Sequence, residues 1–477
     1  METKLAILGA GPGGYVAAIK AASKGIRVTL IEKENLGGTC LNHGCIPSKI
    51  MKNSSDLFLK AKNTAQFGVN INGDISFDIN TLMQRKEKVL ENQRKGIEAL
   101  LKKNSVHYVK GKGYIKDKGL INVELNNGGI KNIEFDKLII ATGTKPLNMK
   151  TFPFDHKTIL SSNDLLKLDT IPESITIVGG GVIGCEFAFI LSGLGSKVTI
   201  VEARDRLLPL PSVDKSISKV LQREMKKKKI KIITGKVVEK ADKNDNYLKL
   251  TMGKSPFLDN DKIKNTPQQI IECEKMAVCV GRTPLASEIG LENIGLNRDE
   301  KGWIKVNNSL ETDIKGVFAI GDILGPLKIM LAHVASHEGM VAVDNIMGKS
   351  SRMQYNAVPG AIFTSPEIGT VGLSEIEAFE KGMDIKSYTV NFRTVGKAQA
   401  IGEIAGEAKI IIEDKTEKIV GVHIIGPHAT DLISEGTLAV TKGLTVSDLA
   451  HTIHAHPTLA EIMWEVALKA SRNPLHS

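Results

Sequence analysis

The chain has 477 residues, more than one hydrophobic core usually serves, so we expect three or four domains. Its hydrophobic fraction of 42% and charged fraction of 24% are those of an ordinary soluble protein, and five cysteines are too few for a secreted disulfide scaffold, which favours the cytoplasm. A net charge of +10 is compatible with nucleic-acid binding, but aromatics make up only 4% and no DNA-binding motif is present, so we expect no nucleic-acid partner.

The chain begins with a dinucleotide fingerprint. A short apolar strand at Leu5 to Leu8 leads into a helix rich in alanine and then into a second strand, Val28 to Ile31, that ends in Glu32. The loop glycines, spaced as G-x-G-x-x-G, are Gly9, Gly11 and Gly14. Such glycines allow a tight turn, a close approach to a pyrophosphate and close helix packing, while the acid accepts hydrogen bonds from a ribose. The pattern predicts a nucleotide at the positive end of this helix.

Residues 37 to 49, GGTCLNHGCIPSK, place Cys40 and Cys45 five positions apart. In a regular helix these residues are separated by about 7.5 Å of rise, beyond the reach of a disulfide, so the two sulfurs meet only if the segment is distorted. Gly44 and Pro47 allow such a distortion. We favour a redox pair; the alternatives are two unrelated thiols or a zinc site, for which only His43 lies near as a further ligand.

Helical patterns follow at about 48–66 and 82–103, and Lys110 to Asn126 alternates like β-structure. Two similar segments, Leu138 to Pro146 and Met276 to Pro284, each combine an apolar strand, a glycine turn and a proline. We expect each of them to close a nucleotide-binding domain.

The fingerprint recurs 170 positions later in the chain. The repeated residues are Gly179, Gly181, Gly184 and Glu202. The chain therefore holds a second dinucleotide site. Its acidic end favours NAD over NADP, although Arg204 lies close enough in sequence to meet a 2'-phosphate. The run Lys226 to Lys229 is interpreted as the solvated end of a helix before a strand at Ile230 to Ile233.

The apolar stretches at Met1 to Gly25 and at 175–196 resemble a secretory leader and a membrane span. Glycines at fingerprint spacing in both, and Glu186 in the second, argue for strand, turn and helix instead. We expect no membrane association.

Val317 to Asp322 is predicted to be a strand that ends in a glycine and an aspartate, and an acid at such a position commonly faces a ligand. A helix is predicted at Leu331 to Met347. From Tyr355 on, strands such as Ala408 to Ile412 and Val420 to Ile424 indicate an antiparallel α+β domain.

The last motif contains His454, His456, Pro457 and Glu461. A His-x-His pair is often only a pair of satisfied polar residues. Here the proline turn leads into a helix on which Glu461 can return to the ring of His456 and orient it, as the partner of a catalytic base does.

Taken together, the segments GGTCLNHGCIPSK, GGGVIGCE, VFAIGD, MLAH and HAHPTLAE resemble the disulfide-reductase flavoproteins, most closely the dihydrolipoamide dehydrogenases, over almost the whole chain. The resemblance implies an α/β fold with two Rossmann-like domains, for FAD and NAD, and a C-terminal α+β dimerisation domain. The implied domains are 1–147 (FAD-binding, first part), 148–270 (NAD-binding), 271–345 (central, FAD-binding, second part) and 346–477 (dimerisation).

The same resemblance assigns roles to single residues. Cys45 would face the flavin and Cys40 would exchange with the substrate, and Lys49 near the flavin would pair with Glu186. His456, oriented by Glu461, would act as the base at the disulfide of the partner in a homodimer. The dihydrolipoyl substrate would be carried by a protein of a 2-oxo acid dehydrogenase or glycine cleavage system, and the electrons would leave as NADH.

The resemblance also implies two sets of cofactor-binding residues and no metal site. The FAD set is Gly9, Gly11, Gly14, Glu32, Lys49, Gly113, Thr142, Gly143, Thr144, Asp322, Met330, Leu331, Ala332 and His333. The NAD set is Gly179, Gly181, Gly184, Glu186, Glu202, Val237 and Gly281.

The chain departs from the family pattern at two positions. His43 stands where a small apolar residue is usual; it either lowers the pKa of a thiol or faces solvent, and we favour solvent. Leu285 replaces a frequent asparagine. The alternatives are a glutathione-type reductase, which should carry a basic residue at Glu202, a mercuric reductase, which typically has a cysteine pair near its C-terminus, or a redox sensor without turnover.

Overall fold

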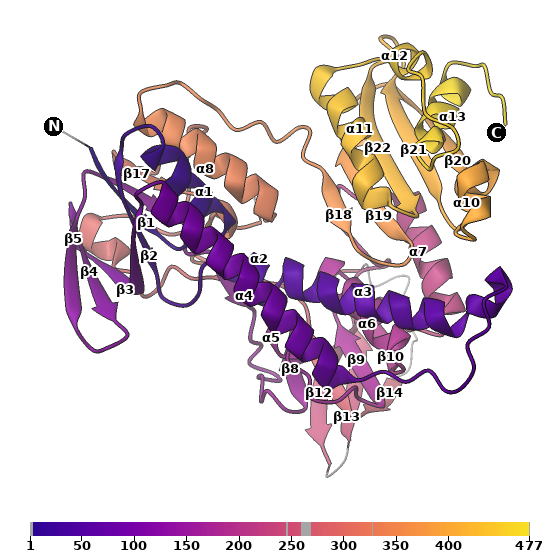
Figure 1. Ribbon diagram of the computed structural model, residues 1–477, viewed down its shortest axis with the longest axis horizontal. Coiled ribbons are helices and arrows are strands. Elements are labelled where there is room, and N and C mark those ends of the chain that lie inside the picture. Colours follow the sequence, from indigo (N-terminus) through magenta and orange to yellow (C-terminus); the bar gives the residue numbers. More distant parts are fainter. Residues whose placement is uncertain (1–2, 245–246, 259–268, 327, 477) are drawn as a thin grey trace. The chain divides into compact units, whose positions relative to one another are not determined.

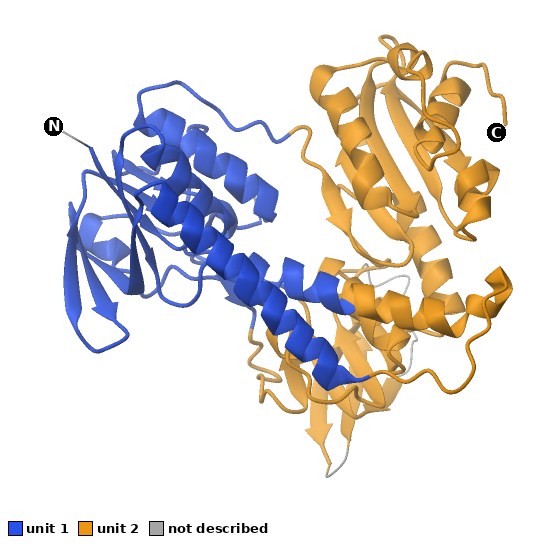
Figure 2. Ribbon diagram, viewed as in Figure 1, with its two compact units in different colours: residues 1–51, 78–147, 281–355 blue, residues 52–77, 148–280, 356–477 orange. Residues whose placement is uncertain are grey.

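The computed structural model describes residues 3–244, 247–258, 269–326 and 328–476 (Figure 1). The chain divides into two compact units, each built from segments distant in sequence (Figure 2). Unit 1 comprises Met1–Met51, Asp78–Leu147 and Gly281–Tyr355, and unit 2 comprises Lys52–Phe77, Asn148–Val280 and Asn356–Ser477.

The main sheet of unit 1 has the strand order β17-β6-β1-β2-β3-β4-β5. The bounds are β1 (Lys4–Leu8), β2 (Arg27–Glu32), β3 (His107–Asp117), β4 (Leu120–Leu125), β5 (Ile130–Glu134), β6 (Lys137–Ile140) and β17 (Val317–Ala319). The strands from β17 to β3 are parallel, whereas β4 and β5 extend the sheet as antiparallel hairpins. Strands β1, β6 and β17 are almost wholly buried, as expected for parallel strands covered on both faces.

The helices of unit 1 are α1 (Pro12–Ala22), α2 (Gly38–His43), the start of α3 (Cys45–Lys62), α4 (Ile79–Lys103), η3 (Leu291–Ile294), η4 (Gly321–Leu324) and α8 (Ala332–Ile346). Helices α1 and α8 pack side by side (Figure 1). A Cβ atom at Gly339 would lie 2.7 Å from the carbonyl oxygen of Gly13, so only a glycine allows this approach. Lys20 and Asp344 join the two helices by an ion pair of 2.7 Å.

The parallel sheet of unit 2 has the order β11-β10-β9-β15-β8. Its strands are β8 (Ile159–Ser161), β9 (Ser174–Val178), β10 (Lys197–Glu202), β11 (Lys231–Thr234) and β15 (Lys275–Val278). An antiparallel sheet lies beside it, formed by β12 (Lys236–Lys243), β13 (Leu248–Lys254) and β14 (Gln269–Cys273). The helices of this part are α5 (Ser162–Leu165), α6 (Val182–Gly193) and α7 (Lys215–Lys227).

The C-terminal part of unit 2 is an antiparallel sheet with the order β18-β19-β22-β21-β20. Its strands are β18 (Gly360–Ile362), β19 (Glu367–Gly372), β20 (Ile385–Asn391), β21 (Glu407–Glu413) and β22 (Ile419–Gly426). Its helices are α9 (Glu375–Glu380), η5 (Phe392–Thr394), α10 (Gly396–Ala400), α11 (Ala429–Lys442), α12 (Val446–Ala450) and α13 (Glu461–Ala470), and η1 (Thr64–Phe67) also belongs to unit 2.

The predicted repeat extends to the strand register. In unit 1, Lys4 pairs with Arg27, and in unit 2, Ser174 pairs with Lys197, each 170 positions later. The predicted strand-turn-helix at 175–196 is confirmed, as are the antiparallel α+β domain and the two α/β sheets. Among the described residues, no helix combines the length and apolar character needed to cross a membrane.

Most predicted elements differ from the structure by a residue or more at their ends, and three of the larger differences are instructive. The helix predicted at 48–66 begins earlier, at Cys45, and gives way to η1 after Lys62. The helix predicted at 82–103 begins at Ile79, because Asp78 caps it by accepting from the amides of Asn80 at 2.9 Å and Thr81 at 3.3 Å. The strand predicted at Val317 to Asp322 ends at Ala319, and the last two residues belong to η4.

The two segments predicted to close the nucleotide-binding domains pair with each other. Their ends form β7 (Thr144–Pro146) and β16 (Arg282–Pro284), a two-stranded antiparallel sheet within unit 1. The amide of Leu147 also donates to the carbonyl of Gly281 at 3.0 Å. The place where the chain leaves unit 1 and the place where it returns are thus joined.

Candidate active site

The two acids that end the fingerprint strands make the same contacts. Glu32 Oε2 accepts from the amide of Ala10 at 2.7 Å, and its Oε1 accepts from Glu34 at 2.8 Å. Glu202 Oε2 accepts from the amide of Gly180 at 2.6 Å, and its Oε1 accepts from Arg204 at 2.7 Å. Each carboxylate therefore connects the end of its strand to its glycine loop. Burial raises the pKa of Glu32, although these two amides oppose the rise.

The space around each glycine matches its predicted role. A Cβ at Gly9 would lie 2.3 Å from a carbonyl oxygen, and one at Gly179 would lie 2.5 Å from another. At Gly14 and Gly184 the corresponding distances are 1.8 and 2.0 Å, to the first glycine of each loop. These four positions are tight turns or close contacts that exclude other residues.

The middle glycines differ from the other four because they adjoin open space. A Cβ at Gly11 would have its nearest neighbour at 3.8 Å, the Cα of Gly38, and a Cβ at Gly181 would have none within 4 Å. Gly11 and Gly181 are the N-caps of α1 and α6, and neither helix has a side-chain cap. Free amides beside open space at a helix N-terminus suit a pyrophosphate.

Thr142, from the predicted FAD set, gives a separate indication of a bound group. Its Oγ1 is buried and has no hydrogen-bond partner among the described residues. A buried hydroxyl without a partner is costly. The residues of the first loop therefore fit FAD, and the open, uncapped second loop fits a second dinucleotide.

The redox pair lies at a break between two helices. Cys40 is in α2, which ends at His43, and Cys45 begins α3. A Cβ at Gly44 would lie only 3.0 Å from the carbonyl oxygen of Thr39, so the chain turns back on α2 at this residue. The turn brings the two thiols together, and they form a hydrogen bond with each other. The predicted distortion is confirmed.

The charges around the pair come from unit 1. The pKa of Cys40 is raised, first by its hydrogen bond to Cys45 and then by burial, while the ammonium of Lys49 lowers it. Burial and, to a smaller extent, Cys40 raise the pKa of Tyr15, so this phenol also lies near the pair. No group of three or more His, Cys, Asp or Glu in the described ranges has a geometry that suits a metal ion.

Helix α2 is held on two sides. Asn42 Nδ2 donates to the carbonyls of Leu36 at 3.0 Å and Gly38 at 2.9 Å, and its Oδ1 accepts from Arg94 of α4 at 3.0 Å. His43 is partly exposed, at 29%, and its Nε2 lies 3.4 Å from Oε2 of Glu34, whose side chain is 57% exposed. The hydrogen bond with His43 lowers the pKa of Glu34.

Asp322, from the predicted FAD set, belongs to a partly buried cluster. Its Oδ2 accepts from Oγ1 of Thr144 at 3.2 Å and lies 4.0 Å from Nε of Arg282, which itself donates to Thr144 Oγ1 at 2.7 Å. Burial raises the pKa of Asp322, while Arg282 and Thr144 oppose the rise. Glu338 fixes the preceding residue, because its Oε2 accepts from the amide of Gly321 at 2.6 Å.

Arg282 is a residue that sequence reasoning missed. Burial lowers its pKa, and the charges of Asp322 and Cys45 oppose this, so the guanidinium lies within electrostatic reach of both Asp322 and Cys45. It stands in the second of the two similar segments, directly after Gly281. This position, next to a residue predicted to bind a cofactor, was the only sequence feature that pointed to it. Its contact with Thr144 depends on the pairing of β7 with β16, which the sequence does not reveal.

The remaining predicted FAD residues also belong to unit 1. Met330 and Leu331 precede α8, whose first residues are Ala332 and His333. Gly113 lies in β3, where a Cβ would meet Leu8 at 2.5 Å. Gly281, predicted for NAD, belongs to unit 1, whereas Val237 lies in β12 of unit 2.

His456 and Glu461 are brought together as predicted. His456 Nδ1 is 2.8 Å from Oε1 of Glu461, whose Oε2 accepts from the amide of Thr458 at 2.9 Å. Burial works to raise the pKa of Glu461, but these two hydrogen bonds outweigh it and lower the pKa. An ionised carboxylate only accepts, so Nδ1 carries a proton and Nε2 is left for proton transfer. The imidazole is 76% exposed.

His454 has a different environment from His456. Its Nε2 is 2.8 Å from Oε1 of Glu435, and its Nδ1 is 2.9 Å from the carbonyl oxygen of Thr452. The hydrogen bond to Glu435 raises the pKa of His454. Both ring nitrogens are engaged, so His454 is a satisfied polar residue that stabilises the loop.

Two further contacts concern the second loop. Glu186 in α6 is buried, and its Oε1 accepts from the amide of Phe363 at 2.9 Å. The guanidinium of Arg204 lies over the ring of Phe257, with 4.8 Å between Cζ and the ring centroid. The cation that sequence reasoning considered for a 2'-phosphate is therefore stacked on an aromatic ring.

Comparison with known proteins gives one family over nearly the whole chain. The pyridine nucleotide-disulphide oxidoreductase profile matches residues 3–339, and the profile of the corresponding dimerisation domain matches residues 358–467. Dihydrolipoyl dehydrogenase of Bacillus subtilis is 41% identical, with 100% of this chain and 99% of the relative covered. That of Chlamydia muridarum is 40% identical, with 98% and 97% covered.

A solved structure agrees with these sequence matches. The crystal structure of LpdA from Mycobacterium tuberculosis matches with a TM-score of 0.89 at 26% identity, covering 98% of this chain and 99% of that one. FAD and NAD are the cofactors of this family, in agreement with the two fingerprints and the fit of their loops. The chain belongs to the pyridine nucleotide-disulphide oxidoreductase family.

Proposed function

We propose that the chain oxidises protein-bound dihydrolipoyl groups and forms NADH, with Cys40 and Cys45 as the disulfide that accepts the electrons. The observation that carries this proposal is the contact of the two thiols at the Gly44 turn, in a chain whose full-length relatives are dihydrolipoyl dehydrogenases. The acid at Glu202, and an Arg204 that is stacked on Phe257, favour NAD over NADP.

The proposed cofactor sites follow the two loops. The first loop, with Glu32, Thr142 and Asp322, would hold FAD, and the second loop, with Glu202, would hold NAD. When bound, FAD supplies a two-electron acceptor and NAD the final hydride acceptor. We assign Cys45 to the flavin side, because it lies within electrostatic reach of Arg282, which contacts two residues of the predicted FAD set.

The substrate half-reaction is a thiol–disulfide exchange. One thiolate of the substrate attacks Sγ of Cys40, which breaks the Cys40–Cys45 bond and releases Cys45 as a thiolate. The second substrate thiol, once deprotonated, attacks the substrate sulfur of this mixed disulfide and releases Cys40. The substrate leaves as a cyclic disulfide, and the two cysteines have gained its two electrons.

His456 is the proposed base for these steps. A thiolate is the attacking species, and an imidazole suits the removal of a thiol proton at neutral pH. Glu461 fixes the tautomer that leaves Nε2 free to accept this proton. Lys49, whose charge lowers the pKa of Cys40, would stabilise a thiolate there.

The chain has a dimerisation domain, and we propose that its homodimer shares each active site between the two subunits. Support comes from the exposure of the catalytic loop: His456 is 76% exposed, and Ile453, three positions earlier, is 97% exposed. This exposure leaves the loop accessible to a second subunit, as a shared site requires.

We further propose that the lipoyl group arrives on a protein of a 2-oxo acid dehydrogenase or glycine cleavage system. The low cysteine count and the bacterial relatives favour a cytoplasmic location. The domain assignment proposed is that of the family: 1–147 and 271–345 for FAD, 148–270 for NAD, and 346–477 for dimerisation.

The purified protein should be yellow and should reduce NAD with dihydrolipoamide. Glutathione disulfide with NADPH is the matched control pair of substrates. Turnover of this control pair without any oxidation of dihydrolipoamide would exclude the proposed substrate.

A hybrid dimer tests whether the active site is shared. Cys45→Ser and His456→Ala homodimers should both be slow, the latter by a factor on the order of 10² or more. A heterodimer of the two variants, isolated with two different tags, combines one intact cysteine pair with one intact histidine from the other subunit. It should recover about half of the wild-type activity, whereas a site formed within one subunit would leave it as slow as the homodimers.

A further inference from the structure

The positive charge of the chain is concentrated in one short stretch. Residues 215–231 contain eight Lys or Arg and one Glu, so this stretch carries most of the net charge of +10. It comprises α7 and the first residue of β11, in unit 2. The eight cations are Lys215, Lys219, Arg223, Lys226, Lys227, Lys228, Lys229 and Lys231, and we call them the α7 basic face.

All eight cations are exposed, whereas the single acid, Glu224, is buried. Glu224 Oε1 lies 3.0 Å from Nε of Arg223 and 2.9 Å from Nζ of Lys227. The other six cations make no ion pair with a described residue. Burial lowers the pKa of Lys228, and besides Glu224 the acids that oppose this from a distance are Asp56 and Glu403.

Those two acids are already engaged elsewhere. Asp56 pairs with Lys52 at 2.5 Å and Glu403 pairs with Lys60 at 2.9 Å. Lys215 and Lys219 also stand at the N-terminal end of α7, where a cation opposes the helix dipole. Cations four apart along the helix repel each other. Most of the positive charge of the α7 basic face is therefore not neutralised by acidic side chains of the described residues.

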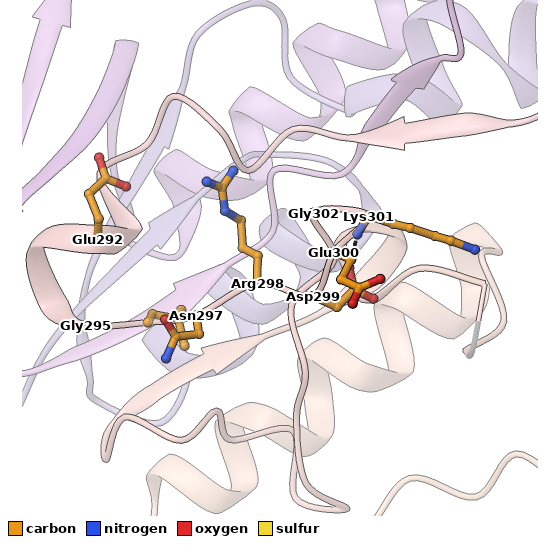
Figure 3. Close-up of a pocket in the computed structure, with 9 residues that line it drawn as sticks. Glu292, Gly295, Asn297, Arg298, Asp299, Glu300, Lys301 and Gly302 are labelled. Carbon is orange, nitrogen blue, oxygen red and sulfur yellow. Dashed lines mark hydrogen bonds between the residues drawn. The ribbon is translucent and has the colours of Figure 1, made fainter.

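Two hollows of similar size differ in the charge of the residues that line them. The first, of about 580 Å³, lies in unit 1 and combines acids such as Glu292 and Glu300 with Arg298 and Lys301 (Figure 3). The second, of about 600 Å³, is formed by α7 alone and is lined by Lys219, Gln222, Arg223, Lys226 and Lys227. The first hollow is lined by three acids and two cations, whereas the second presents four cations and one amide.

The composition of this face narrows the class of partner. Residues 213–231, all of which the structure describes, include no aromatic side chain, so the face offers no platform for stacking bases. The large apolar side chains of α7, such as Ile217, Leu221 and Met225, are buried, so none is available to enter a bilayer. Exposed charge without stacking or insertion fits the acidic surface of a folded protein.

We propose that the α7 basic face is the docking surface for the acidic face of the lipoyl-bearing protein. This inference rests on the proposed function, because that function requires a carrier protein to deliver each dihydrolipoyl group. Docking by charge speeds the encounter and weakens with salt, which suits a carrier that must leave after every turnover.

The test compares two substrates of the holoenzyme. One is a reduced lipoyl domain of strongly negative net charge, and the other is free dihydrolipoamide. The variant is Lys219→Glu with Lys226→Glu, two exposed positions seven apart that line the same hollow. At low salt, kcat/KM for the lipoyl domain should fall about tenfold, and kcat/KM for free dihydrolipoamide should not change.

The matched control is Arg298→Glu with Lys301→Glu in the hollow of unit 1, which changes the net charge equally. It should alter kcat/KM for the lipoyl domain by less than about twofold. The difference between the two variants should disappear in roughly 0.5 M salt, where screening is strong. Unchanged FAD absorbance and melting temperature establish that each variant is folded.

The proposal is overturned if the α7 variant and the control behave alike, since the effect is then one of net charge. It is also overturned if the variant keeps its rate with the lipoyl domain but loses binding to RNA or to vesicles that contain anionic lipid. Failure of the wild-type enzyme to oxidise free dihydrolipoamide contradicts the proposed function instead, so the two failures are distinguishable.

Discussion

The two nucleotide loops share one skeleton but differ in what surrounds them. Both place an acid on the amide of the residue after the first glycine, and both leave the middle glycine beside open space. At Gly11, however, Gly38 stands 3.8 Å from a Cβ position, whereas at Gly181 nothing lies within 4 Å. Gly38 thus lies beside the middle glycine of the first loop, whereas no described residue does so in the second, as expected for a retained cofactor and an exchangeable one.

The same comparison extends to the segments that follow the two acids. After Glu32 the chain forms α2, and α3 begins at Cys45. After Glu202 it forms an irregular loop, and α7 begins at Lys215, 170 positions after Cys45. The first copy carries the redox pair at this point. In the second copy, Asp214 caps α7 and pairs with Lys409 of β21 at 2.9 Å. One repeat therefore carries the proposed redox pair where the other carries a structural ion pair.

The largest expected effect comes from removal of the chemistry of the first copy. Cys45→Ser should lower the rate of dihydrolipoamide oxidation by a factor on the order of 10⁴ or more, because no disulfide can form. NADH binding, measured by fluorescence titration, should stay within about twofold of the wild type because the second loop is unchanged. Retention of full activity would remove the cysteine pair from the mechanism.

Removal of the buried ion pair of the second copy should destabilise the protein. Lys409→Met leaves Asp214, which is 2% exposed, without its cation and should cost about 3–5 kcal/mol of unfolding free energy. The exposed Lys415→Met is the control and should cost less than about 0.5 kcal/mol. Chemical unfolding of the holoenzyme checks both values, and equal effects would show that the pair contributes little.

The pH dependence of this pair has a defined sign. Burial works to raise the pKa of Asp214, but the Ser216 amide and Lys409 outweigh it and lower the pKa from 3.8 to about 2. The contribution to stability, about 2 kcal/mol, is therefore present above pH 3.8 and is lost as the pH falls through about 2. Asp214→Asn should be less stable than the wild type at pH 7 and nearly equal to it near pH 2. If the difference in unfolding free energy between the two proteins did not change with pH, the effect would come from packing and not from the charge of Asp214.

Side chains added at the middle glycines test the contrast between retained and exchangeable cofactors. Gly11→Val should yield protein without its yellow colour, because the valine meets Gly38 and fills the first site. Gly181→Val should keep FAD and raise KM for NAD by about tenfold, since the side chain fills only the second site. Absorbance at the flavin band and steady-state kinetics separate the two outcomes. Full FAD content in the Gly11 variant would contradict the contrast.

The smallest expected effect concerns the choice between NAD and NADP. Phe257→Ala should release the guanidinium of Arg204 and raise kcat/KM for NADP relative to NAD by about two- to fivefold, the range for one exposed cation–π contact. The double variant with Arg204→Gln should lose this gain. If the double variant keeps the gain in kcat/KM for NADP, release of Arg204 is not the cause of that gain.

Sequence reasoning located the features that depend on local pattern. The repeat predicted both glycine loops and both acids, because a βαβ unit fixes them together. The structure adds that the strand register repeats as well. The turn at Gly44 and the pairing of His456 with Glu461 were accessible because the residues involved are close in sequence.

Contacts between segments that are distant in sequence could not be predicted from local sequence patterns. Arg282 meets Thr144, Arg94 meets Asn42 and Lys409 meets Asp214 across 138, 52 and 195 positions. Each depends on which elements pack together. His43 shows the same limit at closer range: its partner Glu34 lies on the preceding loop, and nothing in the spacing favoured this partner over solvent.

The pairing of β7 with β16 has a consequence for how the chain is organised. The chain leaves unit 1 before residue 148 and returns to it after residue 280. These two points are joined by this small sheet and by the hydrogen bond from Leu147 to Gly281. In topological terms residues 148–280 form an insertion whose ends lie side by side. Such an insertion can be lengthened, shortened or exchanged for another nucleotide module while the register of the host sheet β17-β6-β1 stays the same.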